Sequence, residues 1–227
     1  MPAACNIGST GQHRRSLSGG VARRVGVGLA AALLLIDVIN DLEFQGGERL
    51  LPAALAAANR LATLAGRARR AGVPVIYAND NFGRWRSDFS ALLARVLGHG
   101  ARGRPIAERL RPEPSDYVVL KPKHSAFFST TLDLLLRYLK TRTLVIGGFT
   151  ADRCVLFTAS DAYLRDFQVV VPSDGVASLD ERANRLALSQ MRTLLDADVR
   201  PSRSIVLRRA LRSVSYTHLT LPTTSRV

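Results

Sequence analysis

Short apolar runs alternate along this chain with longer amphipathic segments, and this alternation constrains the possible folds more than any other feature. A run of four or five apolar residues is typical of a strand buried on both faces of a sheet. Between such runs apolar side chains recur at three- and four-residue steps, the pattern of an amphipathic helix, as at Leu51, Leu55, Ala58, Leu61 and Leu64. Strands are expected at residues 33–36, 73–77, 117–120, 143–146, 168–171 and 204–207, and helices at 48–71, 88–97, 131–140, 151–165 and 181–196.

The order of these elements predicts the fold class. Strands joined through helices need crossover connections, which place a parallel sheet between two layers of helices. We therefore expect an α/β fold: a three-layer α-β-α sandwich with a six-stranded, mainly parallel, Rossmann-like sheet. Gly72 is expected to end the first long helix and Thr150 to cap the helix over 151–165, while a loop rich in Gly, Arg and Pro follows residue 97.

The two ends of the chain differ in composition from its body. Residues 1–28 begin with a polar stretch rich in Gly and Ser and carry arginines without any acid, so we expect a disordered extension. Residues 213–227 do not share the composition of the body, which is rich in alanine, arginine and leucine, and we expect a non-native, unstructured tail. Residues 29–212 then form one folded domain. The apolar run at 28–36 is too short to span a membrane.

The net charge of +14 invites a nucleic-acid-binding interpretation, but the distribution of the charge does not favour it. Arginines of the body are dispersed, and no basic stripe is interleaved with aromatic residues. The chain has two cysteines, too few for a disulfide framework, which indicates a reducing, cytoplasmic setting with Cys154 free. None of the four histidines pairs with another at ligand spacing, so no metal site is expected.

Reactive side chains follow the predicted strands at their carboxyl ends, where parallel α/β sheets bind ligands. Asp37 follows the first strand, Asn79 and Asp80 the second, and Lys121 the third, while Cys154 lies in the turn after the fourth. In the first turn of a helix, unpaired backbone N–H groups and the dipole favour a thiolate, and Lys121 adds a cation. Asp37 is placed to transfer protons. These groups suit hydrolysis of an amide or carbamoyl compound through a thioester.

Each of these three residues also has a plainer interpretation. Taken alone, Cys154 is typical of a small buried apolar residue. In the same way, Asp37 is typical of a helix cap or turn, and Lys121 of a solvated surface charge. Their convergence on one rim, from three separate strands, favours an active site.

Three sequence blocks resemble the isochorismatase-like cysteine hydrolases, a family that includes nicotinamidases and N-carbamoylsarcosine amidases. The blocks are IDVINDLEF, VVLKPKHSAF and VIGGFTADRCVLFTASDA, and the resemblance extends over residues 31–207. It implies that Cys154 is the nucleophile, Asp37 the acid and base, and Lys121 the third member of a triad. It also implies a cis peptide bond between Phe149 and Thr150, which turns a backbone N–H into an oxyanion hole beside Cys154.

The chain departs from the family pattern on the substrate side. Ile39 and Leu42 stand where the family has Gln and Phe, and Phe44 is expected to supply the aromatic wall instead. The segment after the second strand has Asp80 but none of the metal-binding histidines of nicotinamidases. Neither a zinc site nor nicotinamidase activity is therefore expected.

The segment after Asp80 is expected to form a lid over the pocket. Arg84, Trp85 and Arg86 in this segment would suit a planar or anionic substrate. Alternatively, Trp85 packs the lid down and the arginines face water. His124 lies close to Lys121 in sequence, and a surface or packing role is expected for it rather than catalysis.

The leading hypothesis is a metal-independent, cofactor-free cysteine hydrolase that cleaves a small amide, carbamoyl or ureido C–N bond. Its expected partners are a small-molecule substrate and further copies of the chain in a homo-oligomer, with no nucleic acid and no membrane. Two alternatives stay open. One is vinyl-ether hydrolysis of the isochorismatase type, which uses Asp37 and Lys121 without the thiol. The other is a catalytically idle binding module with the same fold.

Overall fold

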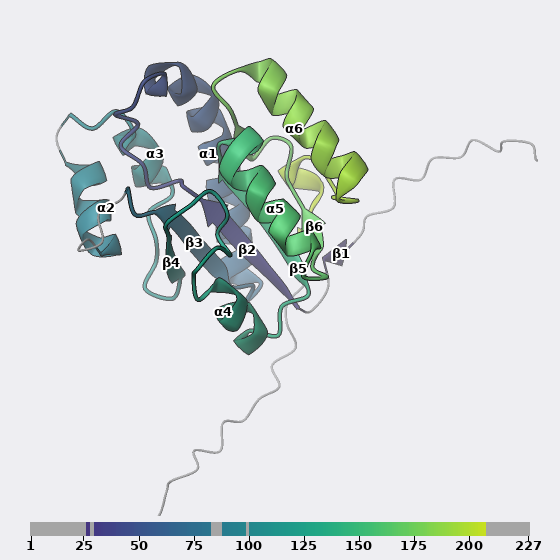
Figure 1. Ribbon diagram of the computed structural model, residues 1–227. Coiled ribbons are helices and arrows are strands. Elements are labelled where there is room, and N and C mark those ends of the chain that lie inside the picture. Colours follow the sequence, from purple (N-terminus) through teal and green to yellow (C-terminus); the bar gives the residue numbers. More distant parts are fainter. Residues whose placement is uncertain (1–25, 28–29, 83–87, 99, 208–227) are drawn as a thin grey trace, which may run out of the picture.

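A parallel sheet of six strands forms the centre of the protein (Figure 1). The computed structural model describes residues 26–27, 30–82, 88–98 and 100–207. The sheet order is β4-β3-β2-β5-β6, with β7 pairing with β5, and every pairing is parallel. The strands are β2 (Ala31–Ile36), β3 (Val75–Asp80), β4 (Tyr117–Lys121), β5 (Thr143–Phe149), β6 (Gln168–Val170) and β7 (Val176–Ala177).

Helices cover both faces of the sheet, which confirms the predicted three-layer α/β fold (Figure 1). One layer contains α1 (Gly47–Arg70), α2 (Phe89–Leu97) and α3 (Arg104–Arg109). The other contains α4 (Leu132–Tyr138), the π-helical turn η1 (Ala151–Val155), α5 (Leu156–Tyr163) and α6 (Glu181–Leu194). Leu33 and Leu35 of β2 pack toward the first layer, and Leu34 and Ile36 toward the second. Successive side chains of a strand point to opposite faces, so this strand fills two cores at once.

Helix α1 shows how the sequence pattern produces burial. Leu50, Leu61 and Leu64 are buried against the sheet on one face of the helix, and alanines between them allow close approach. The helix ends at Gly72, whose φ of +68° is left-handed. The N–H groups of Gly72 and Val73 then donate to the carbonyls of Arg69 and Ala68, which closes the last turn as a Schellman motif. The predicted end of this helix is confirmed.

The last predicted strand forms in part, but its expected place in the central sheet is wrong. Residues 204–207 do not join the central sheet; β8 (Val206–Leu207) instead pairs with β1 (Gly26–Val27) in a separate two-stranded sheet, after a short 3₁₀ turn at Ser202–Ser204. The sixth strand is β7, whose two residues are too short to give an alternating or apolar signal.

Two further segments differ from the expectation. Helix α3 lies in the region expected to be loop only, where Pro105 near its start suits a helix N-terminus. Gly26 and Val27 form a strand inside the extension expected to be disordered. The rest of that extension and the predicted tail at 213–227 lie outside the described residues, so the domain limits 29–212 stay a prediction.

All six strands run toward the same edge of the sheet, because their pairings are parallel. The register places Asp80 opposite Lys121 and Ile36 opposite Gly148. The side chains that follow Ile36 and Gly148 therefore meet next to Asp80 and Lys121. This edge is where the candidate site lies.

Candidate active site

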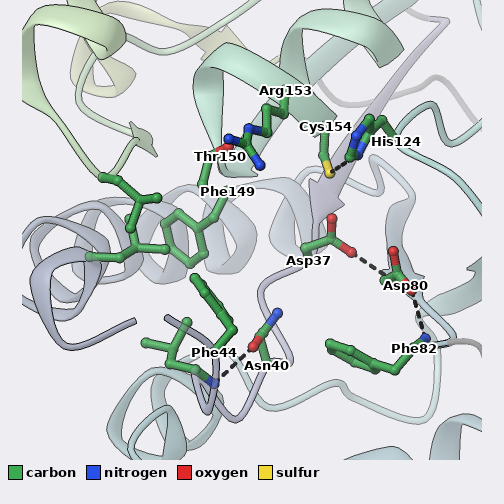
Figure 2. Close-up of a pocket in the computed structure, with 13 residues that line it drawn as sticks. Asp37, Asn40, Phe44, Asp80, Phe82, His124, Phe149, Thr150, Arg153 and Cys154 are labelled. Carbon is green, nitrogen blue, oxygen red and sulfur yellow. Dashed lines mark hydrogen bonds between the residues drawn. The ribbon is translucent and has the colours of Figure 1, made fainter. Parts of the chain in front are cut away.

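Asp37, Lys121 and Cys154 come together at the carboxyl edge of the sheet, as the sequence predicts. Nζ of Lys121 lies 2.8 Å from Oδ2 of Asp37 and 3.5 Å from Sγ of Cys154. The lysine thus contacts both the carboxylate and the sulfur. Figure 2 shows Asp37 and Cys154 facing the same pocket.

Asp37 is held in place by the neighbouring strand β3. Its backbone N–H donates to the carbonyl of Ala78, and its Oδ1 accepts the N–H of Asp80 at 2.7 Å. Its φ of +52° is left-handed, a conformation that aspartate tolerates better than most residues. This turn lets the chain leave β2 while the carboxylate stays over the sheet edge, 6% exposed.

Lys121, the last residue of β4, is fully buried. Besides Asp37 and Cys154, its ammonium donates to the carbonyl oxygen of Lys123 at 3.1 Å, and Oδ2 of Asp80 lies 3.8 Å away. A buried ammonium is costly unless it is paired and hydrogen-bonded, and this one has both kinds of partner. Lys121 therefore lies beneath the pocket rather than in its wall.

Cys154 is aimed into the pocket by an unusual turn after β5. Gly148 has a φ of +126°, and a Cβ at this position would lie 2.1 Å from the carbonyl oxygen of Ile36. Only glycine allows β5 and β2 to approach so closely. The peptide bond between Phe149 and Thr150 is cis, as the family resemblance implies.

The turn that carries the cysteine is π-helical rather than the expected regular helix start. The carbonyl of Thr150 accepts the N–H groups of Arg153 and Val155. Thr150 occupies the predicted N-cap position, but its side chain makes no capping hydrogen bond. Ser178 supports the turn instead, since its hydroxyl donates to Asp152 at 2.7 Å and accepts the Asp152 N–H at 3.3 Å.

The electrostatics of the resting site oppose the expected thiolate. Burial, followed by the charge of Asp37, raises the pKa of Cys154 from 9.0 to about 12, although Lys121 acts in the opposite direction. Burial also raises the pKa of Asp37 above its ordinary value, against the pull of Lys121. Burial lowers the pKa of Lys121, but the Asp37 and Cys154 charges outweigh it and the net pKa is raised. The resting state thus holds a neutral thiol beside a lysine–aspartate ion pair.

The pocket above these groups has a volume of about 280 Å³. Phe44 and Asp80 line it, as expected for substrate-binding residues. Asn79 does not: it is fully buried and its side-chain N–H donates to the carbonyl of Ile39 at 2.8 Å. Asn79 therefore supports the loop after β2 and does not contact the pocket. Arg84, Trp85 and Arg86 lie outside the described residues.

Several pocket residues were not predicted. They are Asn40, Leu42, Leu50, Phe82, His124, Arg153 and Leu179. The packing role expected for His124 agrees with the contact of its ring with Phe157, but the residue also lines the pocket, with its Nδ1 3.6 Å from Sγ of Cys154. Its position three residues after Lys121 in the sequence could have indicated that His124 reaches the pocket. Leu179 gave no signal, since it reaches the pocket from the loop before α6.

No group of three or more His, Cys, Asp and Glu side chains suited to hold a metal ion occurs within the described ranges. The same part of the chain contains no helix long and apolar enough to cross a membrane.

Comparison with known proteins assigns the chain to a family. Residues 31–201 match the isochorismatase domain. The chain belongs to the isochorismatase family. It is 36% identical over 175 residues to the uncharacterized isochorismatase family protein YaaI of Bacillus subtilis, covering 77% of this chain and 96% of that protein. It is 29% identical over 169 residues to maleamate amidohydrolase of Pseudomonas putida, covering 70% of this chain and 77% of that protein.

A solved structure agrees with this assignment. The crystal structure of N-carbamoylsarcosine amidase from Thermoplasma acidophilum matches with a TM-score of 0.59 and 28% identity, covering 76% of this chain and 96% of that chain. This isochorismatase-family protein is accordingly a hydrolase whose relatives include named amidohydrolases.

Proposed function

We propose that the protein is a cysteine hydrolase that cleaves a small amide, carbamoyl or ureido C–N bond through a thioester on Cys154, without a metal. One observation carries the proposal: the Lys121 ammonium contacts both the Asp37 carboxylate at 2.8 Å and the Cys154 sulfur at 3.5 Å, directly under a pocket. The names of two relatives, maleamate amidohydrolase and N-carbamoylsarcosine amidase, support the bond class.

In the first half of the reaction, substrate binding brings a carbonyl carbon next to the thiol. The thiol proton moves to Asp37 as the S–C bond forms, and the carbonyl π electrons move to oxygen. Backbone N–H groups of the turn from Thr150 to Cys154 hold this oxyanion. The C–N bond then breaks, and the leaving nitrogen takes the proton from Asp37.

In the second half, water replaces the amine. Asp37, again a carboxylate, takes a proton from water while the oxygen attacks the thioester carbon. The C–S bond breaks and the sulfur recovers the proton. The raised pKa values fit this role, because they keep the resting thiol neutral and make the Asp37 carboxylate a stronger base for the first proton transfer. The thiolate is transient, and the Lys121 ammonium stabilises it during the steps in which the sulfur carries a negative charge.

The test is an ammonia-release assay on a panel of small primary amides, carbamoyl compounds and ureas. Cys154→Ala should abolish turnover, while the midpoint of thermal unfolding stays close to that of the wild type. Ser160→Ala, which removes another small polar side chain from the same helical layer, is the matched control and should retain turnover. Retained turnover in Cys154→Ala would contradict the thioester route.

Vinyl-ether hydrolysis remains a second candidate, and one observation favours it. A buried carboxyl with a raised pKa is a suitable proton donor to a vinyl carbon, and Asp37 is such a group. This reaction needs no thiolate, so activity that survives alkylation of Cys154 would support it. Loss of all activity and a thiol inert at every pH would favour the idle binding module instead.

Self-association and a cytoplasmic location are also proposed. Leu134, Leu164 and Leu194 are 70%, 74% and 69% exposed in or just after helices of one layer, and exposed apolar side chains of this kind favour an interface between copies. Light scattering after size-exclusion chromatography measures the state directly. A monomer at all concentrations would contradict this part of the proposal.

A further inference from the structure

Arg153, the residue before the nucleophile, lines the pocket with an unpaired charge. Within the described residues its guanidinium forms no hydrogen bond and no ion pair, and its side chain is exposed. The adjacent acid does not neutralise it, because the carboxylate of Asp152 is held by the hydroxyl of Ser178 at 2.7 Å. A cation at the wall of a pocket and free of a counter-ion is available to a ligand.

The acidic side chains that line the pocket lie near the Lys121 ammonium, away from Arg153 (Figure 2). Oδ2 of Asp37 and Oδ2 of Asp80 lie 2.8 Å and 3.8 Å from the Lys121 ammonium. Figure 2 shows Arg153 on the Phe149–Thr150 side of the thiol, with His124 and Asp80 on the opposite side. The pocket is therefore electrostatically asymmetric, with the reactive sulfur between an acidic end and a cationic end.

We propose that Arg153 binds a carboxylate of the substrate, so that the substrate is a small amide or ureido compound carrying a carboxylate on the acyl side of the scissile bond. The substrate-class part of this inference rests on the proposed function. The leaving nitrogen must approach Asp37 to receive its proton, which directs the acyl chain toward the other end of the pocket, where Arg153 lies.

The chemistry of the wall suits this ligand. A planar guanidinium can donate two parallel hydrogen bonds to a carboxylate, a geometry that lysine does not reproduce. Phe44, Phe149 and Leu179 form apolar walls of the same pocket. The volume of about 280 Å³ is below the range typical of drug-sized ligands, which limits the substrate to a short chain.

Two alkylating reagents test the carboxylate site without any turnover. Iodoacetate and iodoacetamide both transfer a two-carbon group to a thiolate with loss of iodide, but only iodoacetate carries a carboxylate. The full-length chain is treated with each, and mass spectrometry of the Cys154 peptide gives the two rates separately from Cys5. The ratio of the two rates cancels any change in the thiol pKa.

We expect the iodoacetate-to-iodoacetamide ratio to fall about tenfold in Arg153→Gln, the size of one charged hydrogen-bonded contact. In Arg153→Lys the ratio should fall by a smaller factor, because lysine keeps the positive charge but cannot donate the two parallel hydrogen bonds of a guanidinium. Arg192→Gln, which removes an exposed arginine near the end of α6, is the charge-matched control and should leave the ratio unchanged. An unchanged ratio in Arg153→Gln, or an equal fall in Arg192→Gln, would overturn the inference.

Hydrolysis of succinamate and succinamide separates this inference from the proposed function. A preference for succinamate that is lost in Arg153→Gln supports both. Equal hydrolysis of the two compounds by wild type and Arg153→Gln leaves the hydrolase in place and overturns the role of Arg153. If no amide in the panel is hydrolysed but the alkylation ratio falls as expected, the carboxylate site stands and the hydrolase proposal fails.

Discussion

Replacing Asp37 by asparagine should stop turnover and at the same time make Cys154 more reactive toward alkylation. Asparagine tolerates the left-handed φ of +52° and keeps an oxygen to accept the N–H of Asp80. It removes the carboxylate that raises the thiol pKa and that pairs with Lys121. The buried ammonium then lacks its nearest anion, and a thiolate at Cys154 is the group best placed to supply one.

The structure sets the size of this effect. The pKa of Cys154 is raised from 9.0 to about 12, and three pH units correspond to about 4 kcal/mol and to a thousandfold smaller thiolate fraction at neutral pH. Burial is the largest cause and persists in the variant, whereas the Asp37 charge is the second cause and is removed. We therefore expect recovery of only part of the factor, about tenfold to a hundredfold faster alkylation at pH 8.

The assay is the rate of iodoacetamide alkylation of Cys154 as a function of pH. A full pH profile separates the thiol pKa from the accessibility of the sulfur, which sets the plateau at high pH. Lys121→Met is the matched opposite change: it removes the cation that favours the thiolate, and alkylation should become slower than in the wild type. Circular dichroism and thermal unfolding confirm that both variants are folded.

Either of two results would refute the reasoning. If folded Asp37→Asn is alkylated at the wild-type rate or more slowly, the charge of Asp37 does not raise the thiol pKa. If Lys121→Met is alkylated faster, the lysine does not favour the thiolate. Either result would remove the electrostatic basis for assigning Asp37 as the group that accepts the thiol proton.

Three predictions concern stability. The folded-state pKa of Cys154 lies above its ordinary value of 9.0, so the stability that the neutral thiol contributes is complete below pH 9 and is lost as pH rises toward 12. By pH 10.5 the free energy of unfolding, measured by urea titration, should fall by about 2 kcal/mol less in Cys154→Ser than in the wild type. Gly148→Ala should lower the free energy of unfolding by about 3 kcal/mol or more, because its Cβ would lie 2.1 Å from the Ile36 oxygen. Gly72→Ala should lower it by about 1 kcal/mol, because nothing lies within 4 Å of the added Cβ. Similar losses in the two variants would contradict the close-approach argument. Ser178→Ala should cost about 1–3 kcal/mol and reduce kcat, and an unchanged urea midpoint would show that its two hydrogen bonds do not support the turn.

The convergence of Asp37, Lys121 and Cys154 could be predicted from the sequence because it depends on local pattern and on topology. Apolar runs end immediately before Asp37 and at Lys121, and both runs proved to be strands of one parallel sheet. Parallel strands present their carboxyl ends at one edge, so residues far apart in the chain must meet there. The contacts of Lys121 with Asp37 and Cys154 are the direct consequence.

The direction of individual side chains could not be predicted in the same way. Asn79 and Asp80 are neighbours in β3, yet Asn79 is buried under the loop at Ile39 and Asp80 lines the pocket. A strand covered on both faces has apolar residues on both, so its sequence does not tell which polar residue faces the ligand. Strand β7 was missed for a related reason, since its two residues are held by pairing with β5 rather than by any local pattern.

The sequence by itself determined the fold class and the sheet edge at which Asp37, Lys121 and Cys154 meet, because these follow from apolar runs and helical periodicity along the chain. Only the tertiary structure decided the protonation state of the site and the shape of the pocket. The thiol pKa is raised because packing buries Cys154 beside Asp37, against the local effect of a helix start. Leu179 completes the pocket because a loop distant in sequence from Cys154 reaches it, which no single segment encodes.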